Sequence, residues 1–388
     1  MLRQLASQLP QPSTDAAEHS AALLQLIVEE IKHQGVISFA RYMDLALYAP
    51  GLGYYVAGSQ KLGASGDFVT APLISPLFSS CLARVAGDIV KGDIFTPLAG
   101  DILELGAGDG QMAVDILRTL TQWNQLPAHY FILEVSPQLR ARQQALLQET
   151  GVDQLTPIVW LDELPRHFRG IIIANEVLDA MPVHRFMVTE QGSVEWGVGL
   201  NDDQQLQWQI VDAEQSAWKQ HAWQQQIAAY QTTLAQAMPT GYISEINPAL
   251  PAFMASLSDS LEQGAILLID YGFERAQYYH PERNQGTLMC HYRHRAHDNP
   301  FLYPGLQDIT AHVDFTSVQE AAKIQQLTVA GYSTQAEFLL DMGILELAAT
   351  LMRSADEITR IRLSQQIQQL TAPHEMGELF KVLLLTRK

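Results

Sequence analysis

An acidic side chain and three alternating glycines follow a short apolar run in the segment DILELGAGDGQMAVDIL, residues 101–117. The acid is Glu104, the glycines are Gly106, Gly108 and Gly110, and a helical pattern of apolar residues begins directly afterwards. Glycines let a backbone turn tightly and approach a ligand without Cβ clashes, and the following helix points its unsatisfied N–H groups at that ligand. Strand, glycine turn and helix therefore predict the ligand-binding edge of a Rossmann-like sheet.

The glycine spacing and the acidic residue of this turn indicate which class of cofactor it binds. A dinucleotide-binding turn has the pattern G-x-G-x-x-G, whereas here the third glycine comes one residue early. The carboxylate of Glu104 would repel a pyrophosphate but could receive an ammonium group. S-adenosylmethionine carries an ammonium and a sulfonium and no phosphate, so the E-x-G-x-G-x-G turn favours this cofactor. The alternative is a glycine-rich turn that binds no ligand.

Composition limits the class of protein. The chain has 388 residues, 47% of them hydrophobic, which fits one large or two ordinary globular domains. A net charge of −18 argues against tight binding to nucleic acid or to anionic membranes. No apolar run reaches membrane-spanning length, and the N-terminal segment resembles neither a secretory signal nor a transit peptide. Two distant cysteines, Cys81 and Cys290, indicate a reducing compartment, and we expect the cytoplasm of a bacterium.

The N-terminal segment is expected to form a helical cap. Apolar residues recur at helical spacing over residues 15–33, and a shorter helix should end before Pro50. A cluster of tyrosines follows, for which core packing and ligand contact are both open: Tyr42, Tyr48, Tyr54 and Tyr55. The loop GDFVT, with Asp67 and Thr70, is positioned to fold over a bound ligand. Ser75 and Pro76 then predict the start of a helix that runs to about residue 90.

Further strands should place acids at the same edge of the sheet. Glu134 ends the second strand roughly 25–30 residues after the glycines, where an acid accepts hydrogen bonds from ribose hydroxyls. An ordinary solvated acid is the alternative. The third strand, TPIVWLDELP, is expected to line an adenine pocket with Trp160, Leu161 and Asp162. The fifth strand, residues 264–272, again ends in an acid, Asp270.

The fourth strand is predicted over residues 170–174 and ends in a polar break at Asn175 and Glu176. Ligands of open parallel sheets bind outside the carboxyl ends of the strands, so this break belongs in the crevice. Asp179 follows three residues after Glu176, and the two carboxylates would share one face if a helical turn begins there. They could equally be charges that the dipole favours at a helix N-terminus.

The remaining segments predict insertions and closing elements. Alternating strands from residue 187 and a Gln-rich helix over about 213–237 form an inserted subdomain. Residues 273–315 read as a long irregular loop, whose Cys290, His291, His294 and His297 match no compact zinc pattern, so we expect no metal. Helices are expected near 317–326, over 334–352 and up to 370, before a last strand in LFKVLLLTRK. We divide the chain into a cap (1–75), a first part of the Rossmann-like domain (76–188), the insertion (189–263) and a second part (264–388).

With these pieces placed, the sequence resembles the MidA-like family of class I methyltransferases. The resemblance runs from about residue 35 to residue 388 and rests on the blocks RYMDLALYAPGLGYY, SGDFVTAP, ELGAGDG, NEVLDAMPVHRF, IDYG, GTLMCHYRHR, DITAHVDFT and MGELFKVL. It implies an α/β, Rossmann-like class I fold with a mainly parallel seven-stranded sheet and helices on both faces. Departures are modest: Leu73 stands where the family usually has an acid, and Val177 and Leu178 replace bulkier aromatics.

The resemblance also implies an activity and a set of site residues. S-adenosyl-L-methionine would donate a methyl group, and a protein arginine is the implied acceptor. The cofactor would be held by residues of the glycine turn, the strand ends and the covering loop: Glu104, Gly106, Ala107, Gly108, Gly110, Glu134, Leu161, Asp67 and Thr70. The acceptor would face Asn175, Glu176 and Asp179.

The family includes a mitochondrial complex I assembly factor that is a protein arginine methyltransferase. Its partner is a complex I core subunit, so a counterpart of that subunit is the extrapolated protein substrate here. Two alternatives remain open, a methyltransferase that acts on a small molecule or another side chain, and an assembly factor that binds the cofactor without catalysis. Neither nucleic acid nor membrane insertion is expected.

The acceptor itself limits the mechanism. Removing a proton from a guanidinium of pKa about 13 would cost roughly 8 kcal/mol at pH 7. A carboxylate of ordinary pKa cannot hold that proton before methyl transfer. We therefore expect Glu176 and Asp179 mainly to orient the guanidinium through charged hydrogen bonds, with the proton leaving during or after transfer.

Overall fold

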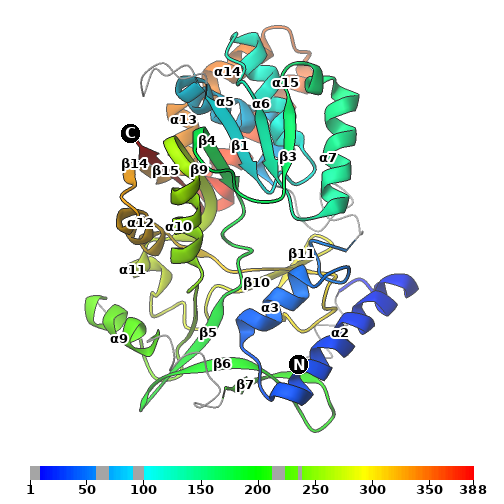
Figure 1. Cartoon of the computed structure of the whole chain (residues 1–388), viewed down its shortest axis with the longest axis vertical. Helices are drawn as coiled ribbons and strands as arrows, with labels where there is room; N and C mark the ends of the chain where they lie inside the picture. Colours follow the sequence, from blue (N-terminus) through cyan, green and yellow to red (C-terminus); the bar gives the residue numbers. More distant parts are fainter. Residues whose placement is uncertain (1–8, 58–69, 91–99, 212–222, 235–237) are drawn as a thin grey trace.

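The computed structural model describes residues 9–57, 70–90, 100–211, 223–234 and 238–388, and an eight-stranded sheet forms its centre (Figure 1). Seven strands follow the order β14-β15-β9-β4-β1-β2-β3, and the short β13 pairs with β9. Their bounds are β1 Asp101–Leu105, β2 Tyr130–Leu133, β3 Ile158–Leu161, β4 Phe168–Asn175, β9 Leu261–Phe273, β13 Val313–Asp314, β14 Thr328–Thr334 and β15 Phe380–Arg387.

Strand directions agree with the expected fold class. Strands β3, β2, β1, β4 and β9 are parallel, and β15 runs antiparallel to both of its neighbours, β9 and β14. The prediction of a mainly parallel, Rossmann-like sheet is confirmed. Sequence reasoning missed β14, because none of its residues TVAGYST is buried and the segment lacks an apolar run.

Both faces of the sheet are covered because its central strands contain consecutive apolar residues whose side chains point alternately to the two faces. Ile171 and Ile173 of β4 point to one face and Ile172 to the other. The first face packs against α5 Pro76–Val90, α6 Gln111–Gln122, α7 Pro137–Thr150, α13 Gln335–Asp341, α14 Ile344–Met352 and α15 Glu357–Thr371. The second packs against α10 Leu250–Ser260 and α12 Phe315–Ile324. Figure 1 shows these layers in its upper half.

A second sheet lies below the carboxyl ends of the parallel strands (Figure 1). It has the order β7-β6-β5-β8 and is antiparallel throughout, with β5 His184–Thr189, β6 Gly192–Leu200, β7 Leu206–Ile210 and β8 Ile243–Ile246. The N-terminal helices α2 Thr14–Gln34 and α3 Phe39–Tyr48 pack against it, and Ile37 pairs with Val198. The expected helical cap and inserted hairpin are thus present. Of the predicted Gln-rich helix over 213–237, the described part is α9, Trp223–Thr233.

Two local predictions are wrong. The segment 273–315 is not an irregular loop, because it contains α11 Arg275–Tyr278 and a three-stranded sheet of β11 Arg295–His297, β10 Met289–Tyr292 and β12 Asp308–Thr310. Its strands are too short to show a periodic pattern. The helix expected over 334–352 is divided at Gly343, which adopts a φ of +74°.

The described helices include none that is long and apolar enough to cross a membrane. Both cysteines are buried and unpaired. The division of the chain into four segments stays a prediction.

The close approach of β1 and β4 depends on Gly170. Its φ is +142°, and a Cβ at this position would overlap the backbone carbonyl of Asp101. We predict that Gly170→Ala lowers the free energy of unfolding by several kcal/mol, because strain of about 1–3 kcal/mol adds to a backbone clash in the sheet. Gly192→Ala is the matched control, since Gly192 has a φ of +118° but open space for a Cβ. Urea denaturation measures both, and equal losses would contradict the proposed clash.

Candidate cofactor and acceptor site

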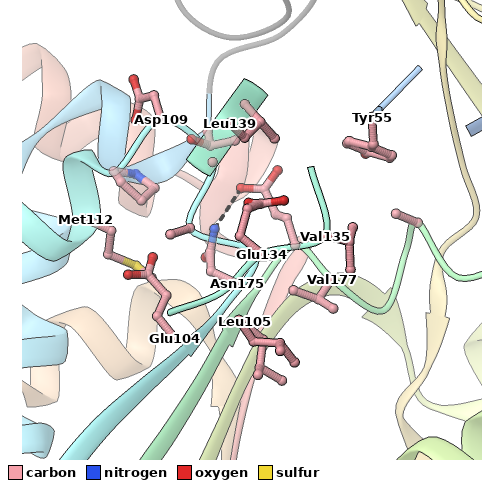
Figure 2. A pocket seen from close by; sticks show the side chains of 18 of the residues that line it. Tyr55, Glu104, Leu105, Asp109, Met112, Glu134, Val135, Leu139, Asn175 and Val177 are labelled. Carbon is pink, nitrogen blue, oxygen red and sulfur yellow. Dashed lines mark hydrogen bonds between the residues drawn. The ribbon is translucent and has the colours of Figure 1, made fainter. Parts of the chain in front are cut away.

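A cavity of about 310 Å³ lies at the carboxyl ends of β1, β2 and β4 (Figure 2). Its volume falls in the range of sites for small molecules. The sheet, the glycine turn, the cap and α10 all contribute to its walls. The lining residues are Tyr48, Tyr54, Tyr55, Thr70, Pro72, Glu104, Leu105, Gly106, Ala107, Gly108, Asp109, Met112, Leu133, Glu134, Val135, Leu139, Asn175, Glu176, Val177, Ala180 and Phe253.

The glycine turn forms one wall. Gly106 and Gly108 line the cavity with φ values of +64° and +57°, and Ala107 lies between them. Gly110 does not line it. Gly110 caps the N-terminus of α6 with a φ of +96°, and a Cβ there would press on Gln143 of α7. The first two glycines therefore shape the cavity, and the third lets two helices approach.

Glu104 lies at the base of the cavity, next to Met112 in Figure 2. Its side chain is buried and accepts a hydrogen bond of 2.6 Å from the hydroxyl of Tyr130. Burial raises the pKa of Glu104 to about 7, although the hydrogen bond from Tyr130 opposes that shift. A buried carboxyl with one phenol partner has a free oxygen for an ammonium group.

Glu134 is oriented by its neighbours in a way that suits a ribose. One carboxylate oxygen accepts the backbone N–H of Ser136 at 2.9 Å, and the other accepts the amide of Gln143 at 2.9 Å. The same Gln143 amide donates to the Gly108 carbonyl, and Trp160 donates to the Gln143 side-chain oxygen. Burial raises the pKa of Glu134, while these hydrogen bonds lower it. The remaining lone pairs of Glu134 are placed to accept hydroxyl groups.

The polar break after β4 adopts a strained turn and no helix. Glu176 has a φ of +54°, and its N–H donates to the carbonyl of Ile269 in β9. The amide of Asn175 donates to the Glu176 carboxyl at 3.1 Å, the dashed line in Figure 2. Burial, with Asp179 nearby, raises the pKa of Glu176 to about 8. The carboxyl of Glu176 is thus held at the cavity wall and is protonated at neutral pH.

More carboxyl groups are buried behind Glu176. Asp270 accepts the N–H groups of Leu178 and Asp179 at 2.9 and 3.2 Å, which fixes the turn. Burial raises the pKa of Asp179 to about 6, against a hydrogen bond from Tyr271, and burial also raises the pKa of Asp270 well above its usual range. One oxygen of the buried Asp179 carboxyl has no hydrogen-bond partner in the structure.

A fourth acid and its tyrosine come from segments far away in the sequence. The hydroxyl of Tyr55, in the cap, donates to Asp308 of β12 at 2.9 Å. Asp308 is buried and contributes to the raised pKa of Glu176. We call Glu176, Asp179, Asp270 and Asp308 the acid cluster. Sequence analysis missed Asp308 because no spacing connects it with Glu176, whereas Asp270 carried a signal as a strand-end acid.

The predicted site residues divide into three groups. Those that line the cavity are Thr70, Glu104, Gly106, Ala107, Gly108, Glu134, Asn175 and Glu176. Gly110 and Asp179 lie behind the wall, and Leu161 accepts a hydrogen bond from Arg140 through its carbonyl outside the lining. Asp67, with most of the GDFVT loop, lies outside the described residues. The functional roles of all of these residues stay predictions.

The four tyrosines of the cap have different roles. Tyr48, Tyr54 and Tyr55 line the cavity, whereas Tyr42 is a core residue that donates to the carbonyl of Pro300. Trp160 and Asp162, expected at an adenine pocket, are not among the lining residues. Trp160 contacts the site indirectly, because it donates a hydrogen bond to Gln143, which in turn donates one to Glu134. In the part of the chain that the structure describes, no group of three or more histidines, cysteines or carboxylates is arranged to hold a metal ion.

Comparisons with known proteins agree with this geometry. The profile of a family of S-adenosyl-L-methionine-dependent methyltransferases, Methyltransf_28, matches residues 88–333. The mitochondrial protein arginine methyltransferase NDUFAF7 of Danio rerio is 30% identical over 95% of this chain and 88% of that protein. The human protein of the same name is 29% identical over 94% of this chain and 83% of that protein.

Two solved structures are similar to this chain over nearly its whole length. A crystal structure of a Burkholderia thailandensis protein bound to S-adenosyl-homocysteine is 39% identical and superposes with a TM-score of 0.88, covering 98% of this chain and 95% of that chain. A second crystal structure from the same organism gives 40% identity and a TM-score of 0.87. Fold and site together define an S-adenosylmethionine-dependent methyltransferase. More particularly, the chain belongs to the MidA-like family, represented by Methyltransf_28, and its cofactor is S-adenosyl-L-methionine.

The residues of the cavity fit that cofactor. Its ammonium group suits Glu104, its ribose suits Glu134, and the left-handed turn at Gly106 and Gly108 lets the backbone approach closely. The buried side-chain oxygen of Asn175, which has no hydrogen-bond partner in the structure, is a further acceptor at the same wall. The walls contain no phosphate-binding cation among the described residues, consistent with a ligand that lacks phosphate.

The raised pKa of Glu176 predicts a pH-dependent stability. The folded state keeps the Glu176 proton up to about pH 8, whereas in the unfolded chain a glutamate carboxyl loses its proton near pH 4.5. The stabilisation is therefore complete below pH 4.5 and lost as pH rises through 8. We predict that Glu176→Gln raises the melting temperature at pH 8.5 by about 3 °C or more and changes it little at pH 5.

The control for this measurement is Glu163→Gln, which alters an exposed carboxyl outside the cavity. Scanning calorimetry of the cofactor-free protein at the two pH values gives both differences. An identical response of the two variants would mean that Glu176 titrates as an ordinary surface acid.

Proposed function

We propose that this enzyme transfers the methyl group of S-adenosylmethionine to an arginine side chain of a protein. The observation that carries the proposal is that three carboxyl groups of the acid cluster, the buried Asp179 and Asp270 and the half-buried Glu176, lie at or behind the cavity wall without an ion-pair partner among the described residues. None of the ion pairs formed by described residues involves Glu176, Asp179 or Asp270. Buried carboxyl groups are normally paired, and a site that leaves them without a cation is suited to receive one.

The surroundings favour a planar cation. Tyr48 and Tyr55 stack with ring centroids 5.5 Å apart at an interplanar angle of 22° and line the cavity on the side of the cap. An arginine head group stacks on aromatic rings and forms several hydrogen bonds with carboxylates in one plane. No lysine or arginine stands among the described lining residues to repel it.

The chemistry follows from these positions. When bound, S-adenosylmethionine supplies an electrophilic methyl group on its sulfonium. Glu176 and the Asn175 side chain orient one guanidinium nitrogen, and positioning of this kind can supply roughly 7–11 kcal/mol of the barrier. Binding of the guanidinium displaces the proton of Glu176. As the new C–N bond forms and the methyl group leaves the sulfonium sulfur, the nitrogen loses one proton to the ionised Glu176 carboxylate.

The relatives named above support the acceptor class, because they are named protein arginine methyltransferases. At about 30% identity, that name supports a proposal for this chain and leaves its substrate to be measured. A subunit related to those of respiratory complex I is the substrate that we propose to test first, and the cytoplasm is the location that we propose.

Methyl transfer to cell extract tests the function directly. Purified enzyme is incubated with an extract from a strain that lacks its gene and with S-adenosylmethionine that carries an isotopically labelled methyl group. Mass spectrometry then identifies the labelled residue. We expect methylarginine in one or a few proteins. Label on lysine or on a small molecule would overturn the arginine assignment, and absence of label with intact cofactor binding would indicate a non-catalytic protein.

Substitution of Glu176 tests the mechanism. We predict that Glu176→Gln lowers kcat at least about 100-fold, because the variant can neither pair with the cation nor accept its proton. Cofactor affinity, measured by titration calorimetry, should change less than about threefold. Glu163→Gln, at an exposed acid outside the cavity, is the control and should leave both values unchanged. Full turnover by Glu176→Gln would exclude this carboxyl from the reaction.

A further inference from the structure

A second cavity, of about 280 Å³, lies on the other side of the turn that follows β4. Its walls come from α9, the end of β8, the start of α10, α11, β13 and α12. We call it the aromatic cavity, after the four rings that line it: Trp223, Tyr230, Tyr278 and Tyr279. No part of the proposed reaction uses it.

Only a thin wall separates the two cavities. Val177 lines the cofactor cavity and the next residue, Leu178, lines the aromatic cavity. On α10, Phe253 faces the first and Pro251 the second. Adjacent Cα atoms are about 3.8 Å apart, and three residues of extended chain span about 10 Å. The residues that line the two cavities are thus separated by a length that a peptide of a few residues can span.

The polar groups of the aromatic cavity are already paired. The hydroxyl of Tyr279 donates to the Glu245 carbonyl, and the Glu245 carboxylate is held by Arg185 and Thr287. Asp314 and Glu320 both pair with Arg275. Because these acids are paired with Arg185 and Arg275, a charged occupant would find them already neutralised. An aromatic occupant can instead pack against the four rings of the lining.

The size and the entrance also favour a large apolar side chain. An apolar cavity of about 150 Å³ is enough for benzene, so the aromatic cavity can hold a phenylalanine ring. Ile324 of α12 lines the cavity with 74% of its surface exposed, which is unusual for isoleucine next to a pocket that could bury it. The ionised side chains in the described lining of the cofactor cavity are all acidic, which suits a segment that carries an arginine.

We propose that the aromatic cavity binds an aromatic side chain of the protein substrate, a few residues from the modified arginine, and so selects which arginine is methylated. This proposal rests on the proposed function insofar as the acceptor is part of a peptide chain. It deepens that function by naming a second recognition element.

Binding of synthetic peptides tests the proposal. Each peptide has one arginine in a glycine and serine background, with phenylalanine placed at one position from three before to three after it, or with serine there instead. Affinity for the enzyme saturated with S-adenosylhomocysteine is measured by fluorescence anisotropy. We expect one spacing at which phenylalanine tightens binding at least about tenfold over serine. Equal or absent binding across both series would overturn the proposal.

Two variants and a matched control assign the effect to this cavity. Ala321→Phe, which fills the cavity from α12, should abolish the preference for phenylalanine, and Ile324→Gln should reduce it at least threefold. Ile358→Gln changes an isoleucine that is 70% exposed on α15, away from the cavity, and should leave the preference intact. Retention of the preference in both cavity variants would overturn the assignment.

The arginine assignment is tested separately with the same peptides. In a third series lysine replaces arginine, and transfer of labelled methyl is measured for all series. Methylation of lysine alone would refute the proposed acceptor, while a phenylalanine preference in binding would still support the aromatic cavity.

Discussion

The burial of carboxyl groups at the carboxyl ends of β4 and β9 is the constraint on which the rest of the site depends. Asp270 accepts two backbone N–H groups of the turn after β4 and one from Tyr271. These bonds hold Glu176 in its left-handed conformation, which an isolated chain would avoid. Without these hydrogen bonds the turn would relax, the Glu176 carboxyl would become solvated, and its pKa would fall toward that of an ordinary glutamate.

The same edge explains why the chain needs its two outer segments. The parallel sheet supplies Glu104, Glu134 and Glu176, but it leaves one side of the cavity open. The cap closes that side with tyrosines, and the small sheet over residues 289–310 supplies Asp308. The inserted sheet and α9 form the far wall of the aromatic cavity. We therefore propose that residues at the ends of the parallel strands bind the cofactor, and that the cap, the small sheet and the insertion recognise the acceptor.

Sequence alone predicted what depends on local pattern. The glycine turn, the acids at strand ends and the helix from Pro76 to Val90 each follow from neighbouring residues, and the structure has the turn and the helix at these positions. Contacts between segments that are distant in the sequence produce no local pattern from which they could be predicted. Asp308 meets Tyr55 across 253 positions, and Gln143 sits inside a helix whose sequence gives no sign that it holds Glu134. Leu161 ends the third strand, at the edge of the sheet and outside the cavity lining, and its role in binding the cofactor stays a prediction.

In the proposed mechanism, the acid cluster holds a proton in place of a cation and releases this proton when the acceptor binds. Titration calorimetry of N-acetyl-arginine amide into the enzyme saturated with S-adenosylhomocysteine, at pH 7 in buffers of different ionisation enthalpy, measures that exchange. We predict release of about one proton per bound arginine in the wild type, since the pKa of Glu176 is about 8, and almost none in Glu176→Gln. Binding without proton release in the wild type would contradict the account.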